Sequence, residues 1–165
     1  MSLSEGYIYE TKIVSIQKGK TGVPGELAGI IDYGESHCMG SITENSPLGI
    51  RGVLNDTAGE LEGEVYEVAY KQDIEPGKAY IISEVSGERA EYEIEIESLD
   101  YSGDEENKGI LFKVTDERLL DLTGGIVQGM SGSPIIQNGK MIGAVTHVFV
   151  SDASMGYGIF IEKML

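Results

Sequence analysis

Residues 124–150 read GGIVQGMSGSPIIQNGKMIGAVTHVFV. Within this stretch a Gly-x-Ser-Gly-x-Pro pattern at 129–134 is followed by two apolar runs, 134–137 and 140–150, joined by Asn138-Gly139. Asn-Gly between two apolar runs is a strong signal for a tight hairpin. The stretch therefore predicts a serine held in a glycine-flanked turn that leads directly into a β-hairpin.

The glycines on both sides of Ser131 suit a hydroxyl nucleophile. Gly129 and Gly132 allow the backbone to turn sharply, so that neighbouring N–H groups can converge on a developing oxyanion. On this interpretation the N–H groups of Gly129 and Ser131 form the oxyanion hole. Glycine and serine also dominate ordinary turns, so a purely structural turn is the alternative. The hairpin favours catalysis, because in chymotrypsin-like folds the nucleophile loop leads into two strands, the second of which lines the specificity pocket.

The rest of the chain reads as an all-β protein with one short helix. Strand-like runs separated by turn residues are found at 7–17, 26–33, 38–43, 48–54, 63–71, 78–85, 89–98, 109–114 and 156–161. Their spacing of roughly 8 to 12 residues is typical of a sandwich or barrel. Residues 116–122 predict a short helix that stops at Gly124-Gly125. A length of 165 residues fits a single domain, 1–165.

Residues 91–97 show the clearest alternation, with Tyr92, Ile94 and Ile96 set against four glutamates. In a strand this pattern places the apolar side chains on one face and the carboxylates on the other. The glutamates suggest either a cation site or a solvated face that discourages edge-to-edge pairing, and the second is favoured. The polar segment 102–109 is expected to be a surface loop.

Composition excludes several classes of partner. Twelve basic and 28 acidic residues give a net charge of −16 and a pI near 4.3, so nucleic acid and anionic membranes are disfavoured. The single Cys38 forms no internal disulfide and no zinc-ligand spacing is present, so neither a cofactor nor a metal is expected. Without an apolar run near ~18 residues, the fragment is expected to be soluble. Residues 1–4 resemble an expression leader, and we expect the natural protein to extend upstream.

Four stretches carry a resemblance to a known family: SIQKGKTGVPGE at 15–26, GSITENSPLGI at 40–50, VTDERLL at 114–120, and residues 123–165. From about residue 7 to 165 the chain resembles the peptidase domain of the SpoIVB sporulation serine peptidases. The resemblance implies a chymotrypsin-like serine endopeptidase, with Ser131 as nucleophile and Asp116 as the third catalytic residue. Considered as a sequence alone, Asp116 serves equally well as a helix cap.

The resemblance also implies a biological setting. The family member is made in the forespore, acts across the intermembrane space on a regulator of an intramembrane protease, and cleaves itself. A membrane anchor and a PDZ domain precede its peptidase domain, and neither is present in this chain. Its catalytic histidine lies in a Gly-Ala-Leu-Gly-His segment that residues 1–165 also lack. Loss of a triad member costs on the order of 10⁴ to 10⁶ in rate, so we expect the fragment to be nearly inactive.

Two histidines are the remaining candidates for a base. His37 is expected on the surface or in a turn, and with the adjacent Cys38 it makes a poor dyad because neighbouring strand residues point to opposite faces. Cys38 is expected to behave as a small buried hydrophobe. His147 lies on the strand that should border the specificity pocket. By analogy with picornavirus-type proteases it reads a substrate side chain, and the alternative is a packed strand histidine.

Met130 occupies the position where ordinary chymotrypsin-like enzymes carry an Asp that pairs with a newly freed N-terminus, so that route of activation is excluded. The main alternative to a peptidase acting on a protein substrate is a β-barrel module that binds a partner peptide by strand addition. It predicts a buried or hydrogen-bonded Ser131 hydroxyl with Asp116 elsewhere, whereas the peptidase requires both in one cleft. Because an upstream segment is expected to be missing, we expect an incomplete barrel, and its exposed strand edges would favour a homo-oligomer.

Overall fold

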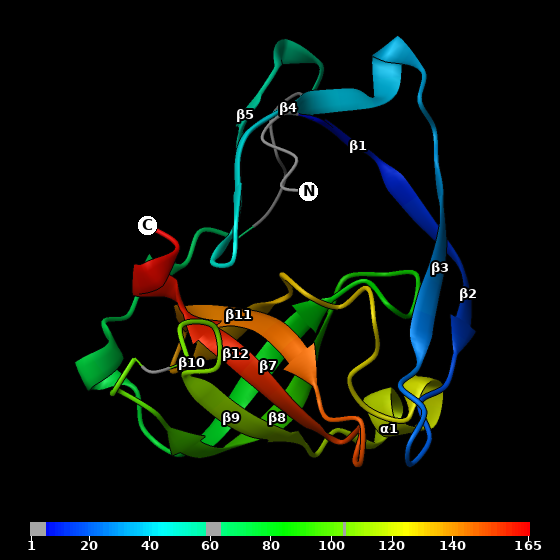
Figure 1. Cartoon of the computed structure of the whole chain (residues 1–165). Helices are drawn as coiled ribbons and strands as arrows, with labels where there is room; N and C mark the ends of the chain where they lie inside the picture. Colours follow the sequence, from blue (N-terminus) through cyan, green and yellow to red (C-terminus); the bar gives the residue numbers. More distant parts are fainter. Residues whose placement is uncertain (1–5, 59–63, 104) are drawn as a thin grey trace.

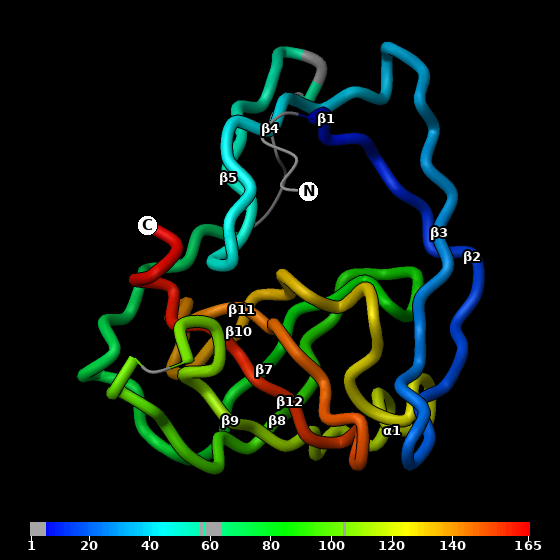
Figure 2. The backbone as a smooth tube through the Cα atoms, viewed as in Figure 1, coloured from blue at the N-terminus to red at the C-terminus, as the bar shows by residue number. Residues whose placement is uncertain are grey.

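A computed structural model describes residues 6–58, 64–103 and 105–165, and the expected leader lies outside them. Two parts can be distinguished: a β-barrel, and an arch formed by residues 6–54 that stands over it (Figures 1 and 2). The two hairpins of the arch, residues 11–31 and 38–54, both reach back to the barrel (Figure 1). The arch therefore lies over the side of the barrel that carries residues 140–148.

The barrel consists of six antiparallel strands: β7 (Gly77–Ser83), β8 (Ala90–Leu99), β9 (Ile110–Val114), β10 (Pro134–Gln137), β11 (Lys140–Val148) and β12 (Met155–Phe160). They are ordered β10-β7-β8-β9-β12-β11, and β10 also pairs with β11. The barrel is therefore closed, which confirms the predicted all-β, chymotrypsin-like class. The expectation of an incomplete barrel was wrong, because β10 pairs with both β7 and β11 and leaves no gap between the six strands. The predicted hairpin at Asn138-Gly139 is the β10–β11 turn.

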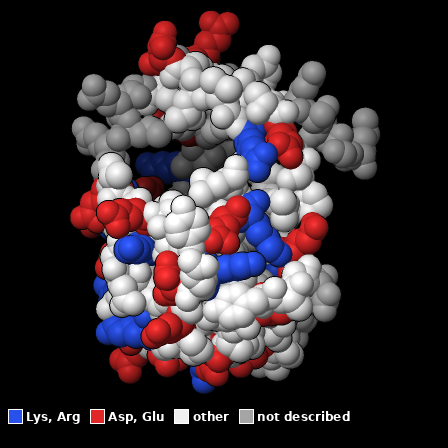
Figure 3. Space-filling model, turned by 90° about the vertical axis from the view of Figure 1, so that its left-hand side faces the viewer, with Lys and Arg blue, Asp and Glu red and all other residues white. Residues whose placement is uncertain are grey.

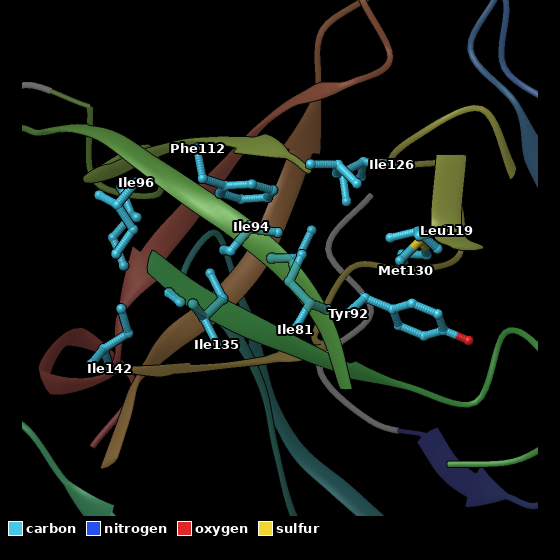
Figure 4. Close-up of a cluster of buried hydrophobic side chains, with 14 of the residues drawn as sticks. Ile81, Tyr92, Ile94, Ile96, Phe112, Leu119, Ile126, Met130, Ile135 and Ile142 are labelled. Carbon is cyan, nitrogen blue, oxygen red and sulfur yellow. The ribbon is translucent and has the colours of Figure 1, made fainter. Parts of the chain in front are cut away.

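The barrel core follows from the alternation along β8. Tyr92, Ile94 and Ile96 are at most 2 % exposed. Ile94 and Ile96 lie in the barrel with Ile81, Phe112 and Ile135, and the Tyr92 ring extends from the same face towards Leu119 and Met130 (Figure 4). The glutamates of β8 point outward, and Glu93 pairs with Lys78 at 2.5 Å. Each large apolar side chain that is fully buried contributes about 1.5–3 kcal/mol. The two faces of β8 are confirmed as predicted.

The one α-helix, α1 (Glu117–Thr123), connects β9 to the loop that bears Ser131. It begins after Asp116, whose carboxylate accepts from the N–H groups of Arg118 and Leu119, and it ends at Gly124 in a left-handed conformation (φ 78°). Its buried residue Leu119 lies beside Met130 (Figure 4). The prediction of a helix over 116–122 is confirmed to within one residue.

The arch contains two small sheets. Strands β1 (Gly6–Tyr9), β4 (Cys38–Ser46) and β5 (Gly49–Leu54) form one, and β2 (Thr11–Gln17) pairs with β3 (Glu26–Ile31) in the other. The prediction of a single strand over 7–17 was wrong, because the chain changes pairing partner at Glu10. The Glu10 N–H donates to the carbonyl of His37 instead of to a neighbouring strand.

The prediction of a strand over 63–71 was also largely wrong, and its first residue lies outside the described residues. Only β6 (Glu67–Val68) forms there, parallel to the start of β11. Val65 is 98 % exposed, so this part of the apolar pattern does not face a core. Short 3₁₀ turns complete the chain at Glu35–His37, Asp56–Ala58, Lys71–Asp73 and Ile161–Lys163.

The arch contacts the rest of the molecule at two places, the β2–β3 turn and the β4–β5 turn, which we call its feet. At the β2–β3 turn, Gly19 N–H donates to Thr123 O (2.8 Å), and Gln128 exchanges 2.8 Å bonds with Gly25 and Leu27. At the β4–β5 turn, Asn107 Nδ2 lies 3.5 Å from Pro47 O. The molecule is hollowed between the arch and the barrel, and charges of both signs are interspersed on that face (Figure 3). The arch therefore bridges α1 and the mouth of the barrel.

Candidate active site

The loop that carries Ser131 is held against β11 by backbone bonds. Gly132 N–H donates to Val145 O (2.8 Å), and Val145 N–H donates to Ser133 O (2.9 Å). Within the loop, Met130 N–H donates to Val127 O and Ser133 N–H to Met130 O, both at 3.1 Å. The path needs left-handed backbone at Gly129 (φ 101°) and Gly132 (φ 91°), which glycine supplies without the usual steric cost.

Met130 fixes the direction of the neighbouring serine. Its side chain is 1 % exposed and packs in the core beside Leu119 (Figure 4). Because the chain turns sharply at the flanking glycines, Ser131 is exposed while Met130 is buried. The apolar residue before the serine therefore acts as an anchor for the loop.

Two N–H groups of this loop are unengaged. Within the part of the chain that the structure describes, neither Gly129 N–H nor Ser131 N–H donates to a backbone or side-chain acceptor. Both residues are exposed, so these N–H groups are open to water or to a ligand that approaches the Ser131 hydroxyl. These are the two donors that the sequence predicts for an oxyanion hole.

The Ser131 hydroxyl has a partner of its own. Its Oγ donates to Thr146 O at 3.0 Å. The Thr146 hydroxyl in turn lies 2.6 Å from Asn107 O and 3.1 Å from Tyr157 O. This arrangement tethers the serine to β11 and leaves its oxygen able to accept a further hydrogen bond.

Asp116 is engaged in a different cluster at the start of α1. Its carboxylate accepts from the N–H of Glu93 (3.2 Å) and from the Arg118 side chain, with Nη2 at 2.7 Å. The Arg118 side chain first, and then these backbone donors, lower the pKa of Asp116 to about 2. Arg118 also lies over the Tyr92 ring, 5.3 Å from its centroid. No contact joins Asp116 to Ser131 among the described residues.

The histidines lie in different places. His37, on the arch, has both ring nitrogens next to carboxylates, Nδ1 at 3.2 Å from Glu10 and Nε2 at 3.4 Å from Asp32. Cys38 beside it is half-buried, with its Sγ 3.7 Å from Gly40 O. His147 is exposed on β11 and lines the same pocket as Ser131. The structure thus brings Ser131 and His147 together and leaves His37 and Asp116 outside that pocket.

The pocket next to Ser131 has a volume of about 210 Å³. Its walls include residues that the sequence did not indicate, above all Leu48 of the β4–β5 turn and Met164 near the C-terminus. Pro47, Leu48 and Gly49 do belong to a stretch with family resemblance, but nothing in their pattern reveals that they approach the serine loop. Only the folded arch brings them there.

Neither a metal site nor a membrane-spanning helix is found among the described residues. Among the described residues no group of three His, Cys, Asp or Glu side chains is arranged to hold a metal ion. In the same part of the chain no helix has the length and apolar character needed to cross a membrane.

A closed antiparallel barrel, with a serine on a glycine-flanked loop before its last three strands, defines the class of chymotrypsin-like serine peptidase domains. Comparison with known proteins identifies the family within that class. The chain belongs to the SpoIVB peptidase S55 family, whose model matches residues 1–165, the whole chain. No curated protein and no solved structure matches the chain.

Proposed function

We propose that this chain is the nucleophile-bearing part of a sporulation endopeptidase that acts through an acyl-enzyme at Ser131. The observation that carries the proposal is the exposed Ser131, next to two unengaged N–H groups and a pocket. A tetrahedral oxyanion needs such donors, and one donor is typically worth about 3 kcal/mol in the transition state.

The chemistry follows the usual two steps. Ser131 Oγ forms a bond to the scissile carbonyl carbon while its proton passes to a general base, and the oxyanion accepts from Gly129 and Ser131 N–H. The C–N bond then breaks, the amine leaves with that proton, and water hydrolyses the ester. In this proposal Asp116 orients the base, which requires its carboxylate to be released from Arg118.

The general base is proposed to come from outside residues 1–165. His37 is held between two carboxylates on the arch, and no hydrogen bond joins His147 to Ser131 among the described residues. The chain by itself should therefore be inactive or nearly so. By family membership, the natural substrates are a regulator of an intramembrane protease and the peptidase itself, and the parent protein is secreted across the forespore membrane into the intermembrane space.

Labelling with a fluorophosphonate, followed by intact mass, tests this proposal. The chain is compared with a form extended upstream to include the family's histidine segment, each with a Ser131→Ala variant and a matched Ser133→Ala control. Labelling only in the extended form, lost in Ser131→Ala and kept in Ser133→Ala, supports the peptidase. A folded extended form that does not label overturns it.

A second function, peptide binding without catalysis, is favoured by two observations: the Ser131 hydroxyl is hydrogen-bonded, and Asp116 is held by Arg118. In that case the arch strands would add a partner strand, or a second copy of the chain, at their edges. Exposed apolar side chains on these strands, such as Ile30 (62 %) and Val53 (62 %), favour such pairing. Light scattering tests the self-association, and a strict monomer at every concentration overturns it.

A further inference from the structure

The pocket next to Ser131 is built from three separate parts of the chain. Its lining includes Val145 and Ile159 of the barrel, Leu48 of the β4–β5 turn, and Met164 near the C-terminus. The turn and the C-terminal segment touch directly: a Cβ placed on Gly49 would lie 3.2 Å from Met164 Cε. The pocket therefore exists only while the arch rests on the barrel.

The chemistry of the lining is apolar. Apart from His147, none of the described residues that line it has an ionisable side chain, although the chain carries 28 acidic residues. Two of the polar side chains present are already paired: Ser46 Oγ with Gly49 O and Leu48 N–H (both 3.3 Å), and the Thr146 hydroxyl with Asn107 O. What remains to contact a ligand is mainly aliphatic surface.

Size and position limit the occupant. An apolar cavity of about 150 Å³ is large enough for benzene, so about 210 Å³ accommodates one side chain of medium size. A charged side chain placed there would lose hydration, and His147 is the one ionisable side chain among the described residues of the lining that could pair with it, so its burial is costly. The pocket is lined by Ser131 together with Val145 and His147 of β11, the second strand after the serine loop, which lines the specificity pocket in chymotrypsin-like folds. On that basis a side chain seated here is assigned to the residue on the acyl side of the attacked bond.

Resting on the proposed function, we infer that this pocket selects a substrate with a medium-sized, uncharged apolar side chain on the acyl side of the scissile bond. Leu48 and Met164, which lie outside the barrel strands, determine the size of that side chain. Full burial of such a group is worth about tenfold or more in affinity over a group left in water.

The test uses binding to residues 1–165, so it does not depend on catalysis. The protein carries ¹³C labels on Met ε and Ile δ1 methyls, and it is titrated with product-like N-acetylated tripeptides, Ala-Ala-Leu, Ala-Ala-Met, Ala-Ala-Lys and Ala-Ala-Asp. The Met164 and Ile159 resonances are expected to shift, with at least tenfold tighter binding of the Leu and Met peptides. The Met39 and Met155 methyls, which do not line the pocket, are internal controls.

Variants then test the assignment of size. Leu48→Ala and Met164→Ala should enlarge the pocket and shift the preference severalfold towards an Ala-Ala-Phe peptide. The matched controls are Val53→Ala and Leu165→Ala. Val53 is 62 % exposed, Leu165 is 78 % exposed, and neither lines the pocket. These two variants should leave the preference unchanged. All four side chains lie at the surface or near it, so folding should be preserved and can be checked by the methyl spectrum.

The outcomes separate this inference from the proposed function. Equal affinity for the Leu and Asp peptides, or shifts that leave Met164 and Ile159 unmoved, overturns the inference even if Ser131 labels in the extended form. Selective binding of the Leu peptide supports the pocket even if the folded extended form never labels, and in that case the peptidase proposal alone is lost.

Discussion

The Asp116 carboxylate and the Arg118 guanidinium are joined by two hydrogen bonds, Nη2 to Oδ2 at 2.7 Å and Nε to Oδ1 at 3.1 Å. The same carboxylate accepts from the backbone N–H groups of Glu93, Arg118 and Leu119. A carboxylate offers about four lone-pair sites, so these donors fill it. An imidazole N–H can approach Asp116 only if the Arg118 side chain leaves.

This pairing predicts a specific acid sensitivity. The pKa of Asp116 is lowered to about 2, so its ionised form stabilises the fold above the ordinary pKa near 4, and that contribution is lost as the pH falls from about 4 to 2. Because the guanidinium is exposed, we expect on the order of 1 kcal/mol. Urea unfolding of the parent and of Asp116→Asn should differ by this amount at pH 7, and the difference should shrink as the pH falls from about 4 towards 2.

Asp116→Ala serves as the control in this series. Asn retains a capping oxygen whereas Ala does not, so Asp116→Ala should lose about 1 kcal/mol more than Asp116→Asn at every pH. Equal stability of the two variants at pH 7 would mean that the cap contributes nothing. A difference between parent and Asp116→Asn that persists undiminished at pH 2 would contradict the titration of this carboxylate.

The catalytic role proposed for Asp116 is separable from its role as a cap. In the extended form, Asp116→Asn should slow fluorophosphonate labelling of Ser131 by at least about 10²-fold, since an amide orients a catalytic histidine in the wrong tautomer. Asp121→Asn, on the same helix, is the matched control and should label like the parent. An unchanged rate for Asp116→Asn in a folded protein would leave Asp116 as a cap only.

The glycines of the serine loop should differ in their tolerance. Gly129→Ala and Gly132→Ala both place a side chain at positive φ, at a cost of about 1–2 kcal/mol. A Cβ at Gly129 would also lie 3.0 Å from Leu27 Cβ, whereas one at Gly132 meets nothing within 4 Å. Gly129→Ala should therefore be the less stable variant by thermal unfolding, and Leu27→Ala should partly rescue it. Equal losses would show that the contact with β3 is unimportant.

Thr123 should be sensitive to loss of its hydroxyl. This residue is fully buried, and its Oγ1 lies 2.8 Å from Leu119 O and 2.5 Å from Gly125 O. Thr123→Val keeps the shape but leaves a buried carbonyl unpaired, so we expect a loss of about 1–3 kcal/mol in unfolding free energy. Thr123→Ser keeps the hydroxyl and should lose less. If Ser proves worse than Val, packing of the methyl group and not the hydrogen bond dominates here.

Local patterns were sufficient to predict most of the barrel. The alternation of residues 91–97, the Asn138-Gly139 turn and the cap at Asp116 each act over a few residues, and each appears in the structure where it was expected. The strand predicted over 7–17 failed because no local signal at Glu10 reveals a change of partner. At the candidate site the glycine-flanked serine was evident, whereas Leu48 and Met164 were not, because they reach the pocket through contacts between residues distant in sequence.

The foot of the arch at the β2–β3 turn joins segments that lie far apart in the sequence, and this affects the order of folding. Lys18 Nζ donates to Asp121 O across 103 residues, and Gly22 N–H donates to Val150 O (2.9 Å). Contacts between such distant residues form late, because closing a long loop costs entropy before any bond repays it. The backbone of Gln128, three residues before Ser131, is held by the same foot through its hydrogen bonds with Gly25 and Leu27. A partly synthesised or partly folded chain would therefore lack an ordered serine loop until the segments around Gly22 and Val150 have met.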